Sequence, residues 1–233
     1  CRSKVVKEFN INTKKNEAIT RCPDLNFNCE DILREKLKHF VSKDALNIEG
    51  FGKKFVQKFW DKKLIKYPYD IFKLDMNILK KFDGWGEKSI SNLKNSINKS
   101  KKVSLDRFIF SLGIRHIGQE NAKVLAKYFL NIKNFFEMSE KLNKNNQMYL
   151  SELQSIDGIG NSQTDSLKKF FLKDKNLKIL TELMRILNVD DYKFLSKKTP
   201  ISGKLVMFTG GFVDKSRSEL KSLAENLGAK IVS

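Results

Sequence analysis

The sequence is poor in residues that carry much of enzyme chemistry. Its 233 residues include only 2 His, 3 Cys and 3 Pro. No motif pairs the two histidines, His39 and His116, as a catalytic couple. The sequence also lacks a phosphate-binding P-loop, a His-Glu-x-x-His metal motif and a Gly-x-Ser-x-Gly nucleophile motif. These absences leave the chain without a candidate catalytic residue.

Long apolar runs are absent as well. No run approaches the roughly 20 residues that a membrane-spanning helix needs, so we expect no membrane partner. Three cysteines without a secretory signal favour a reducing compartment, and we expect a cytoplasmic protein. The sequence starts with Cys1 rather than Met. We therefore expect further residues to precede it.

Negative charge is scarce relative to positive charge. Lys and Arg number 45 against 27 Asp and Glu, which gives a net charge of +18. Such an excess favours a polyanionic partner. By itself it also suits a basic surface that binds no polyanion.

Glycine is used in a recurring pattern, seen most clearly in residues 82–97. Two glycines, Gly84 and Gly86, enclose one large apolar residue, Trp85, and a helix-like segment follows. The glycines predict a tight turn that a residue with a Cβ would resist. We expect Trp85 to anchor the turn to a core, and Ile90, Leu93 and Ile97 to form one buried helix face.

This unit occurs four times in the sequence. Its copies are residues 48–52, 82–86, 114–118 and 156–160, and their closing glycines lie 34, 32 and 42 residues apart. Such a period indicates a repeated supersecondary unit. Apolar or small residues recur four and seven positions after each closing glycine, namely Val56, Ile90, Ala122 and Thr164, then Phe59, Leu93, Leu125 and Leu167.

The pattern is that of the helix-hairpin-helix, which grips a nucleic-acid backbone without reading its sequence. Amide groups at each turn and at the following helix N-terminus form an anion site. The predicted backbone-binding residues are Gly50, Gly52, Gly84, Gly86, Gly118, Gly158 and Gly160. In the third copy His116 replaces the first glycine, which predicts a stiffer turn with weaker phosphate binding or none.

The fold class is therefore mainly α, in three modules. Residues 1–29 form a small cysteine-containing module, residues 30–195 a helical domain with four hairpins, and residues 196–233 a linker and an α/β segment. Within the domain, apolar spacing predicts helices at 30–46 and 53–66. Segments 70–81, 104–112 and 147–155 lead into the other hairpins, the polar segment 137–148 is expected to be a loop insertion, and the 18 Phe are expected to pack in the core.

The first module contains all three cysteines, Cys1, Cys22 and Cys29. Their spacing resembles one knuckle of a zinc site, but a structural zinc ion takes four ligands. A further cysteine upstream of Cys1 would complete the set, and His39 is a poorer candidate because it lies on the predicted helix. Three unrelated thiols remain the alternative.

The last module follows a predicted linker at 197–200. Residues 205–208 read as a strand closed by Thr209, Gly210 and Gly211. Residues 216–227 read as a helix with Leu220, Leu223, Ala224 and Leu227 on one face, stopped by Gly228. Residues 229–232 begin a second strand, so we expect this module to continue past the given C-terminus.

Residues 81–84 match Lys-x-Asp-Gly, the nucleotide-binding lysine motif of nucleotidyltransferases. The hairpin already accounts for Asp83 and Gly84, and the other three copies have no lysine at this position. We therefore expect Lys81 not to be catalytic.

The order of these modules resembles the C-terminal half of bacterial NAD-dependent DNA ligase. Residues 21–23 with Cys29 are similar to that family's second zinc knuckle, and residues 1–3 to the end of its first, with Arg2 where the family usually has Gly. Residues 40–50 and 112–118, the latter including Gly113, are similar to its first and third hairpin signatures, where a non-glycine at position 116 is usual. Residues 200–210 are similar to the start of its BRCT domain.

The resemblance implies that Cys1, Cys22 and Cys29 bind zinc, and that Gly113 joins the backbone-binding glycines. It implies a parent enzyme that seals nicks in replication and repair, using NAD and magnesium bound outside this chain. This part, a monomer associated with the bacterial nucleoid, would clamp nicked duplex DNA regardless of sequence and be inactive in adenylation. The alternatives are a free-standing helix-hairpin-helix module of a repair or recombination complex and, less favoured, an interaction scaffold.

Overall fold

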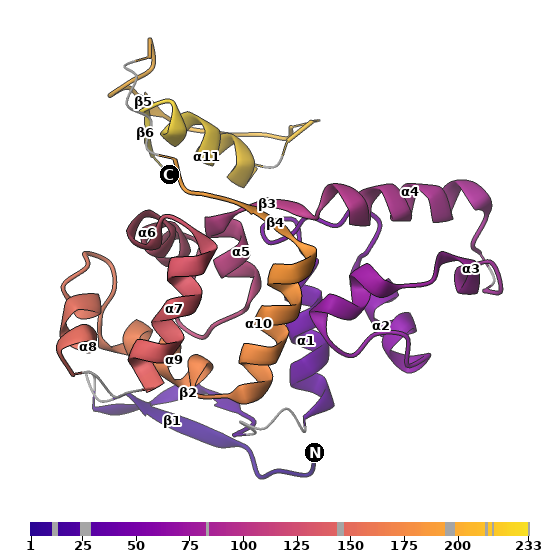
Figure 1. Ribbon diagram of the computed structural model, residues 1–233, viewed down its shortest axis with the longest axis horizontal. Coiled ribbons are helices and arrows are strands. Elements are labelled where there is room, and N and C mark those ends of the chain that lie inside the picture. Colours follow the sequence, from indigo (N-terminus) through magenta and orange to yellow (C-terminus); the bar gives the residue numbers. More distant parts are fainter. Residues whose placement is uncertain are drawn as a thin grey trace.

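A computed structural model describes residues 1–10, 14–23, 29–82, 84–143, 147–193, 199–212, 214–215 and 217–232. The described chain is mainly helical, with three small two-stranded sheets. Figure 1 shows the helices gathered in the middle, the sheet of β1 and β2 below them and the C-terminal segment above. No helix among the described residues is long and apolar enough to cross a membrane.

The N-terminal module contains a hairpin that the sequence analysis missed. Strands β1 (Val6–Asn10) and β2 (Lys15–Arg21) pair antiparallel, with Val6 opposite Arg21 and Asn10 opposite Lys15. Apolar side chains on both strands stay exposed, including Phe9 at 61% and Ile19 at 60%. Because none of the side chains that the structure describes in these two strands is buried, the alternation that identifies a half-buried strand is missing from the sequence.

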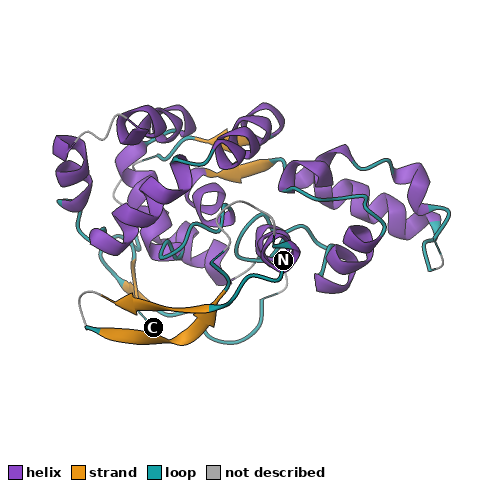
Figure 2. Ribbon diagram, turned by 90° about the horizontal axis from the view of Figure 1, so that it is seen from below, coloured by secondary structure: helices purple, strands orange, loops and turns teal. Residues whose placement is uncertain are grey.

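The helical domain consists of two groups of helices with α10 (Asp174–Ile186) between them (Figure 1). Figure 2, turned by 90°, shows how helices make up most of the described chain. One group comprises α1 (Glu30–Phe40), α2 (Lys53–Asp61), the 3₁₀ helix η1 (Pro68–Lys73), α3 (Met76–Leu79) and α4 (Glu87–Lys99). The other comprises α5 (Leu105–Ser111), α6 (Gln119–Phe129), α7 (Ile132–Asn143), α8 (Gln147–Gln154) and α9 (Asn161–Phe171). Helix α10 packs against η1 and α9.

The first two predicted helices extended too far at their C-terminal ends. Helix α1 ends at Phe40 rather than at residue 46, and α2 ends at Asp61 rather than at 66. Lys63 adopts φ +56° and its N–H donates to Trp60 O, which closes α2. Segment 70–81 is interrupted at Asp75, whose side chain accepts a hydrogen bond from Asn77 N and starts α3.

The expected loop at 137–148 was wrong. Helix α7 continues to Asn143 and α8 begins at Gln147. Phe135, Met138 and Leu142 are buried at helical spacing, and Ser139 is buried beside them. The charged residues between them, Glu137, Glu140 and Lys141, are exposed. The longer interval between the last two hairpins therefore contains an additional helix.

A parallel strand pair joins distant parts of the domain. Strand β3 (Lys102–Ser104) pairs with β4 (Asn188–Asp190), so the residues after α4 lie beside those after α10. Val103 is buried in this pair. Three-residue strands carry too little periodicity to be predicted.

The C-terminal strand-helix-strand order is confirmed. Strands β5 (Leu205–Val206) and β6 (Lys230–Ile231) pair in parallel, and α11 (Arg217–Asn226) connects them. Gly228 follows the helix with φ +83°. Ala224 is buried, but Leu223 is 46% exposed, so the expected apolar face is only partly covered. Of the predicted linker, Lys197 and Lys198 lie outside the described residues.

The core is rich in phenylalanine, as expected. The fully buried side chains include Phe40, Phe51, Phe59, Phe108, Phe135 and Phe171. Their rings meet edge to face at several places, for example Phe135 against Phe171 at 5.4 Å between centroids. These rings are packing elements and are not available to stack on bases.

Candidate nucleic-acid interface

All four predicted turns adopt the same hydrogen-bonded structure. In each, the N–H of the apolar residue donates to the carbonyl three residues earlier. The bonds are Phe51 to Ile48 at 3.1 Å, Trp85 to Phe82 at 3.2 Å, Ile117 to Ile114 at 3.1 Å and Ile159 to Ile156 at 2.9 Å. The repeat read from the sequence is thus a repeat of backbone geometry.

The third residue of each turn has a positive φ. The values are +76° at Gly50, +84° at Gly84, +58° at His116 and +85° at Gly158. Turns of this kind need a left-handed residue at that position, and glycine adopts it without a Cβ clash. His116 therefore keeps the turn of the other copies at a cost in backbone strain.

The closing glycines play a different part, because each one starts a helix. Gly52, Gly86, Gly118 and Gly160 are extended N-cap residues of α2, α4, α6 and α9. Their carbonyls accept from Val56, Ile90, Ala122 and Thr164, the residues four positions on, all of which are buried. The residues seven positions on, Phe59, Leu93, Leu125 and Leu167, are buried as well.

The exposed glycines leave room for a close backbone contact. A Cβ on Gly52 or Gly86 would meet no atom within 4 Å. The first N–H groups of a helix have no intrahelical acceptor, and with the helix dipole they favour a bound anion. Four similar N-termini are therefore presented at the surface, each after a turn whose left-handed residue, Gly50, Gly84, His116 or Gly158, is exposed.

Hairpins 3 and 4 differ from hairpins 1 and 2 in how the closing amide is used. Asn121 Oδ1 accepts from Gly118 N at 3.3 Å, and Gln163 Oε1 accepts from Gly160 N at 3.1 Å. The corresponding residues in hairpins 1 and 2 are Phe55 and Ser89. Hairpin spacing alone did not identify these side chains.

Gly113 directly precedes its turn and is half-buried. Its N–H donates to Phe110 O at 3.1 Å, and a Cβ there would approach His39 Cδ2 to 3.3 Å. Its φ is +58°, and Asn47 at the same place in hairpin 1 has φ +49°. The Gly113 amide is thus used inside the protein, and glycine there fits both the backbone angle and the His39 ring.

Hairpins 1 and 2 meet through aromatic rings. Trp85 of hairpin 2 lies 5.0 Å from Phe55 and 5.9 Å from Phe59, between centroids. This contact confirms Trp85 as the anchor of its turn. Its ring joins the second turn to α2, the helix that follows the first turn.

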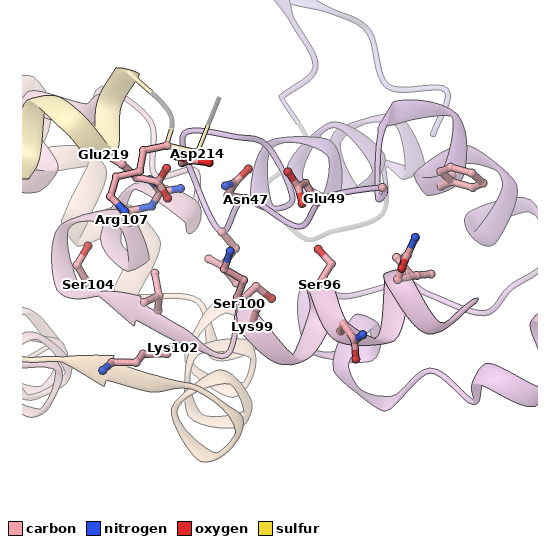
Figure 3. Close-up of a pocket in the computed structure, with 18 of the residues that line it drawn as sticks. Asn47, Glu49, Ser96, Lys99, Ser100, Lys102, Ser104, Arg107, Asp214 and Glu219 are labelled. Atoms are coloured by element: carbon pink, nitrogen blue, oxygen red, sulfur yellow. The ribbon is translucent and has the colours of Figure 1, made fainter. Parts of the chain in front are cut away.

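An open cleft of about 1260 Å³ lies beside these two hairpins. Its lining includes Gly50, Gly84, Ser96 and Lys99 of α4, and Lys102. Asp214 and Glu219 of the C-terminal segment line the same cleft, on the side where Arg107 lies (Figure 3). The lining therefore mixes lysines with carboxylates. The cations are Lys99, Lys102, Arg107 and Lys215, and the carboxylates are Glu49, Asp190, Asp214 and Glu219, so a polyanion would meet both attraction and repulsion there.

Arg107 contacts both the helical domain and the C-terminal segment. Its Nε donates to Ala45 O at 2.9 Å and its Nη2 to Lys43 O at 2.6 Å, in the loop that precedes hairpin 1. Its Nη1 lies 3.5 Å from Glu219 Oε1. One guanidinium thus fixes the loop before hairpin 1 and forms an ion pair with α11.

The three cysteines converge, as the sequence analysis expected. Their sulfur atoms all lie within 4.8 Å of one another, and Cys1 Sγ is 3.5 Å from Cys22 Sγ. Two thiolates on one tetrahedral zinc ion would be roughly 3.8 Å apart for Zn–S bonds of about 2.3 Å. Cys29 is buried at the start of α1. The donor set therefore fits a thiolate-preferring metal ion.

Lys81 is exposed at the end of α3, where its N–H donates to Ile78 O. Asp83 of the Lys-x-Asp-Gly match lies outside the described residues. The nearby Gly84 takes the same conformation as Gly50 and Gly158, which have no such lysine. The hairpin geometry thus accounts for Gly84 without a nucleotide.

Similarity to a known family identifies the kind of motif that the hairpins form. A family model described as helix-hairpin-helix motif matches residues 107–180, from α5 into α10. That range contains hairpins 3 and 4. Hairpins 1 and 2 share their turn geometry, so the motif extends through the domain.

The more particular likeness is to DNA ligases. The chain is 47% identical over 233 residues to the DNA ligase of Pelagibacter ubique (strain HTCC1062). This match covers 100% of the chain and 34% of that protein. It is 43% identical over 221 residues to the DNA ligase of Rickettsia bellii (strain OSU 85-389), and this match covers 92% of the chain and 32% of that protein. The chain thus spans about a third of the length of these relatives. The resemblance to DNA ligase is confirmed over the whole chain.

Proposed function

We propose that this chain is the DNA-clamping part of an NAD-dependent DNA ligase, which seals nicks in duplex DNA during replication and repair. The observation that carries the proposal is the fourfold turn with an exposed glycine at each helix N-terminus, in a chain similar throughout to DNA ligases. The likeness to ligases favours this function over a free-standing module of a repair or recombination complex.

The proposed mechanism is a grip on the two sugar-phosphate strands. Main-chain amides at Gly50, Gly52, Gly84, Gly86 and Gly158 are directed at phosphates. Gly118 and Gly160, whose own amides donate to Asn121 and Gln163, contribute through their helix N-termini. Phosphate contacts position a protein without reading bases, which suits an enzyme that must act at any nick. Exposed lysines beside the turns, such as Lys53, Lys54 and Lys88, add charge.

We propose three modules with bounds 1–29, 30–195 and 196–233, the last being BRCT-like. Cys1, Cys22 and Cys29 hold a structural zinc ion together with a fourth ligand. NAD and magnesium act elsewhere in the parent enzyme, so this part does not catalyse adenylation. The chain acts as a monomer in the bacterial cytoplasm, at the nucleoid.

The test is a titration of nicked and intact duplexes of unrelated sequences at two or more salt concentrations. We expect similar affinity for different sequences and a steep loss with salt, because each phosphate neutralised contributes about 0.9 to the slope of log K against log salt. An affinity that does not change with salt would refute the proposal. Incubation with labelled NAD should leave no AMP on Lys81, and a label there would overturn its assignment as non-catalytic.

A further inference from the structure

The residue three positions after the closing glycine links neighbouring hairpins. In hairpin 1 this residue is Phe55, whose ring packs on Trp85 of hairpin 2. In hairpin 3 it is Asn121, whose Nδ2 donates to Gly158 O of hairpin 4 at 2.8 Å. The hairpins are therefore paired, 1 with 2 and 3 with 4, through the same position of the repeat.

The two links differ in chemistry. The Asn121 amide makes two directional bonds, since its Oδ1 also accepts from Gly118 N at 3.3 Å. One planar group thus joins the closing glycine of hairpin 3 to the first glycine of hairpin 4. A side-chain amide supplies both the acceptor that the Gly118 N–H needs and the donor that the Gly158 carbonyl needs, whereas an ionised carboxylate supplies acceptors alone. The ring contact between Phe55 and Trp85 sets no such fixed register.

Further residues on the same face of α6 lie close to hairpin 4 and to α8, the helix that leads into it. Val124 Cγ2 would lie 3.7 Å from a Cβ placed on Gly158. One turn further, the Tyr128 hydroxyl donates to Glu152 of α8, the helix that leads into hairpin 4. Burial, and secondarily this hydrogen bond, raise the pKa of Tyr128 to about 12.

We infer that Asn121 is a positioning residue that fixes hairpins 3 and 4 as one preorganised unit for the DNA backbone. This inference rests on the proposed function. A preformed spacing between two phosphate-binding turns spares the ordering that binding would otherwise require. Asn121 acts through Gly158 and Gly118, and its loss separates two sites that bind as one.

The first test is duplex binding by the full 233-residue chain with Asn121→Ala, beside Gln163→Ala as the matched control. Gln163 caps Gly160 in the same way, but the hydrogen bond of its Oε1 stays within its own hairpin. We expect about tenfold weaker binding for Asn121→Ala, which corresponds to about 1.4 kcal/mol, and a salt slope lower by about one phosphate contact. Gln163→Ala should bind within about twofold of the parent chain. Equal affinity and slope for all three proteins would overturn the inference.

A second pair of variants separates the cross-hairpin bond from the helix cap and from folding. Asn121→Asp keeps the acceptor for Gly118 N but loses the donor to Gly158 O. Gln163→Glu adds the same charge at the equivalent position. We expect Asn121→Asp to bind several-fold more weakly than Gln163→Glu, and equal binding would contradict the inference even if Asn121→Ala did not fold. If the parent chain itself showed no salt-dependent binding, the proposed function would fail instead.

Discussion

His116 and Gly158 occupy the same position of two paired turns and share a left-handed backbone, with φ values of +58° and +85°. A residue with a Cβ meets the following carbonyl in this conformation, at a cost of roughly 1–2 kcal/mol. Glycine avoids this clash but loses more chain entropy on folding. The turn is therefore retained with either residue, at a different cost.

We expect Gly158→Ala to lower the free energy of unfolding by about 1 kcal/mol, because the new Cβ adds strain in this conformation. His116→Gly should change it by less than about 1 kcal/mol, because relief of strain and loss of chain entropy oppose each other. Denaturant unfolding of the two variants measures both values. A larger loss for His116→Gly than for Gly158→Ala would contradict this account.

The closing glycines offer a test that separates binding from stability. A Cβ at Gly52 or Gly86 meets no atom of the protein within 4 Å, and neither residue has a positive φ. We expect Gly52→Ala and Gly86→Ala to retain the fold, apart from about 0.5–1 kcal/mol at the helix N-cap, and to weaken duplex binding severalfold. Gly211→Ala is the control, since Gly211 is equally open but lies outside the hairpins. Unchanged affinity in Gly52→Ala and Gly86→Ala would show that phosphates do not approach these residues.

The cysteine cluster makes an experiment with cobalt informative. Because the three sulfur atoms lie within 4.8 Å of one another, we expect Co²⁺ to give thiolate charge-transfer absorption, and Zn²⁺ to displace it. Cys22→Ser or Cys29→Ser should abolish most of that absorption. Absorption that persists in both variants would place the metal elsewhere.

Lys36 on α1 provides a pH-dependent test of packing. Burial, and secondarily the charge of Lys173, lower the pKa of Lys36 from 10.5 to about 8. Between pH 8 and 10.5 the unfolded chain holds the proton and the folded chain does not, so stability contributed at this site rises with pH. We expect Lys36→Met to be more stable than the parent chain at pH 7, by about 1–3 kcal/mol. This difference in the free energy of unfolding should shrink as the pH rises from 8 to 10.5. Denaturant unfolding at several pH values measures it. A difference that stays constant would show that Lys36 does not titrate in this window.

The sequence was sufficient for the parts of the fold that depend on local pattern. The turns at Gly50, Gly84 and Gly158 and the buried face of α4 followed from glycine and apolar spacing. Helix α7 was missed because its polar outer face dominates the composition, and β3 was missed because its partner strand begins 86 residues later, at Asn188. The role of Asn121 could not be predicted, because it depends on a carbonyl that only the tertiary fold brings near.

Arg107 interacts with two separate parts of the chain. The bonds to Lys43 and Ala45 lie within the helical domain, whereas the pair with Glu219 reaches the C-terminal segment. Release of α11 would thus open the cleft on the side of Glu219 (Figure 3). Arg107 would still hold the loop before hairpin 1 through its bonds to Lys43 and Ala45. It would also free one arm of the guanidinium for an incoming phosphate, so Glu219 and the nucleic acid would compete for the same cation.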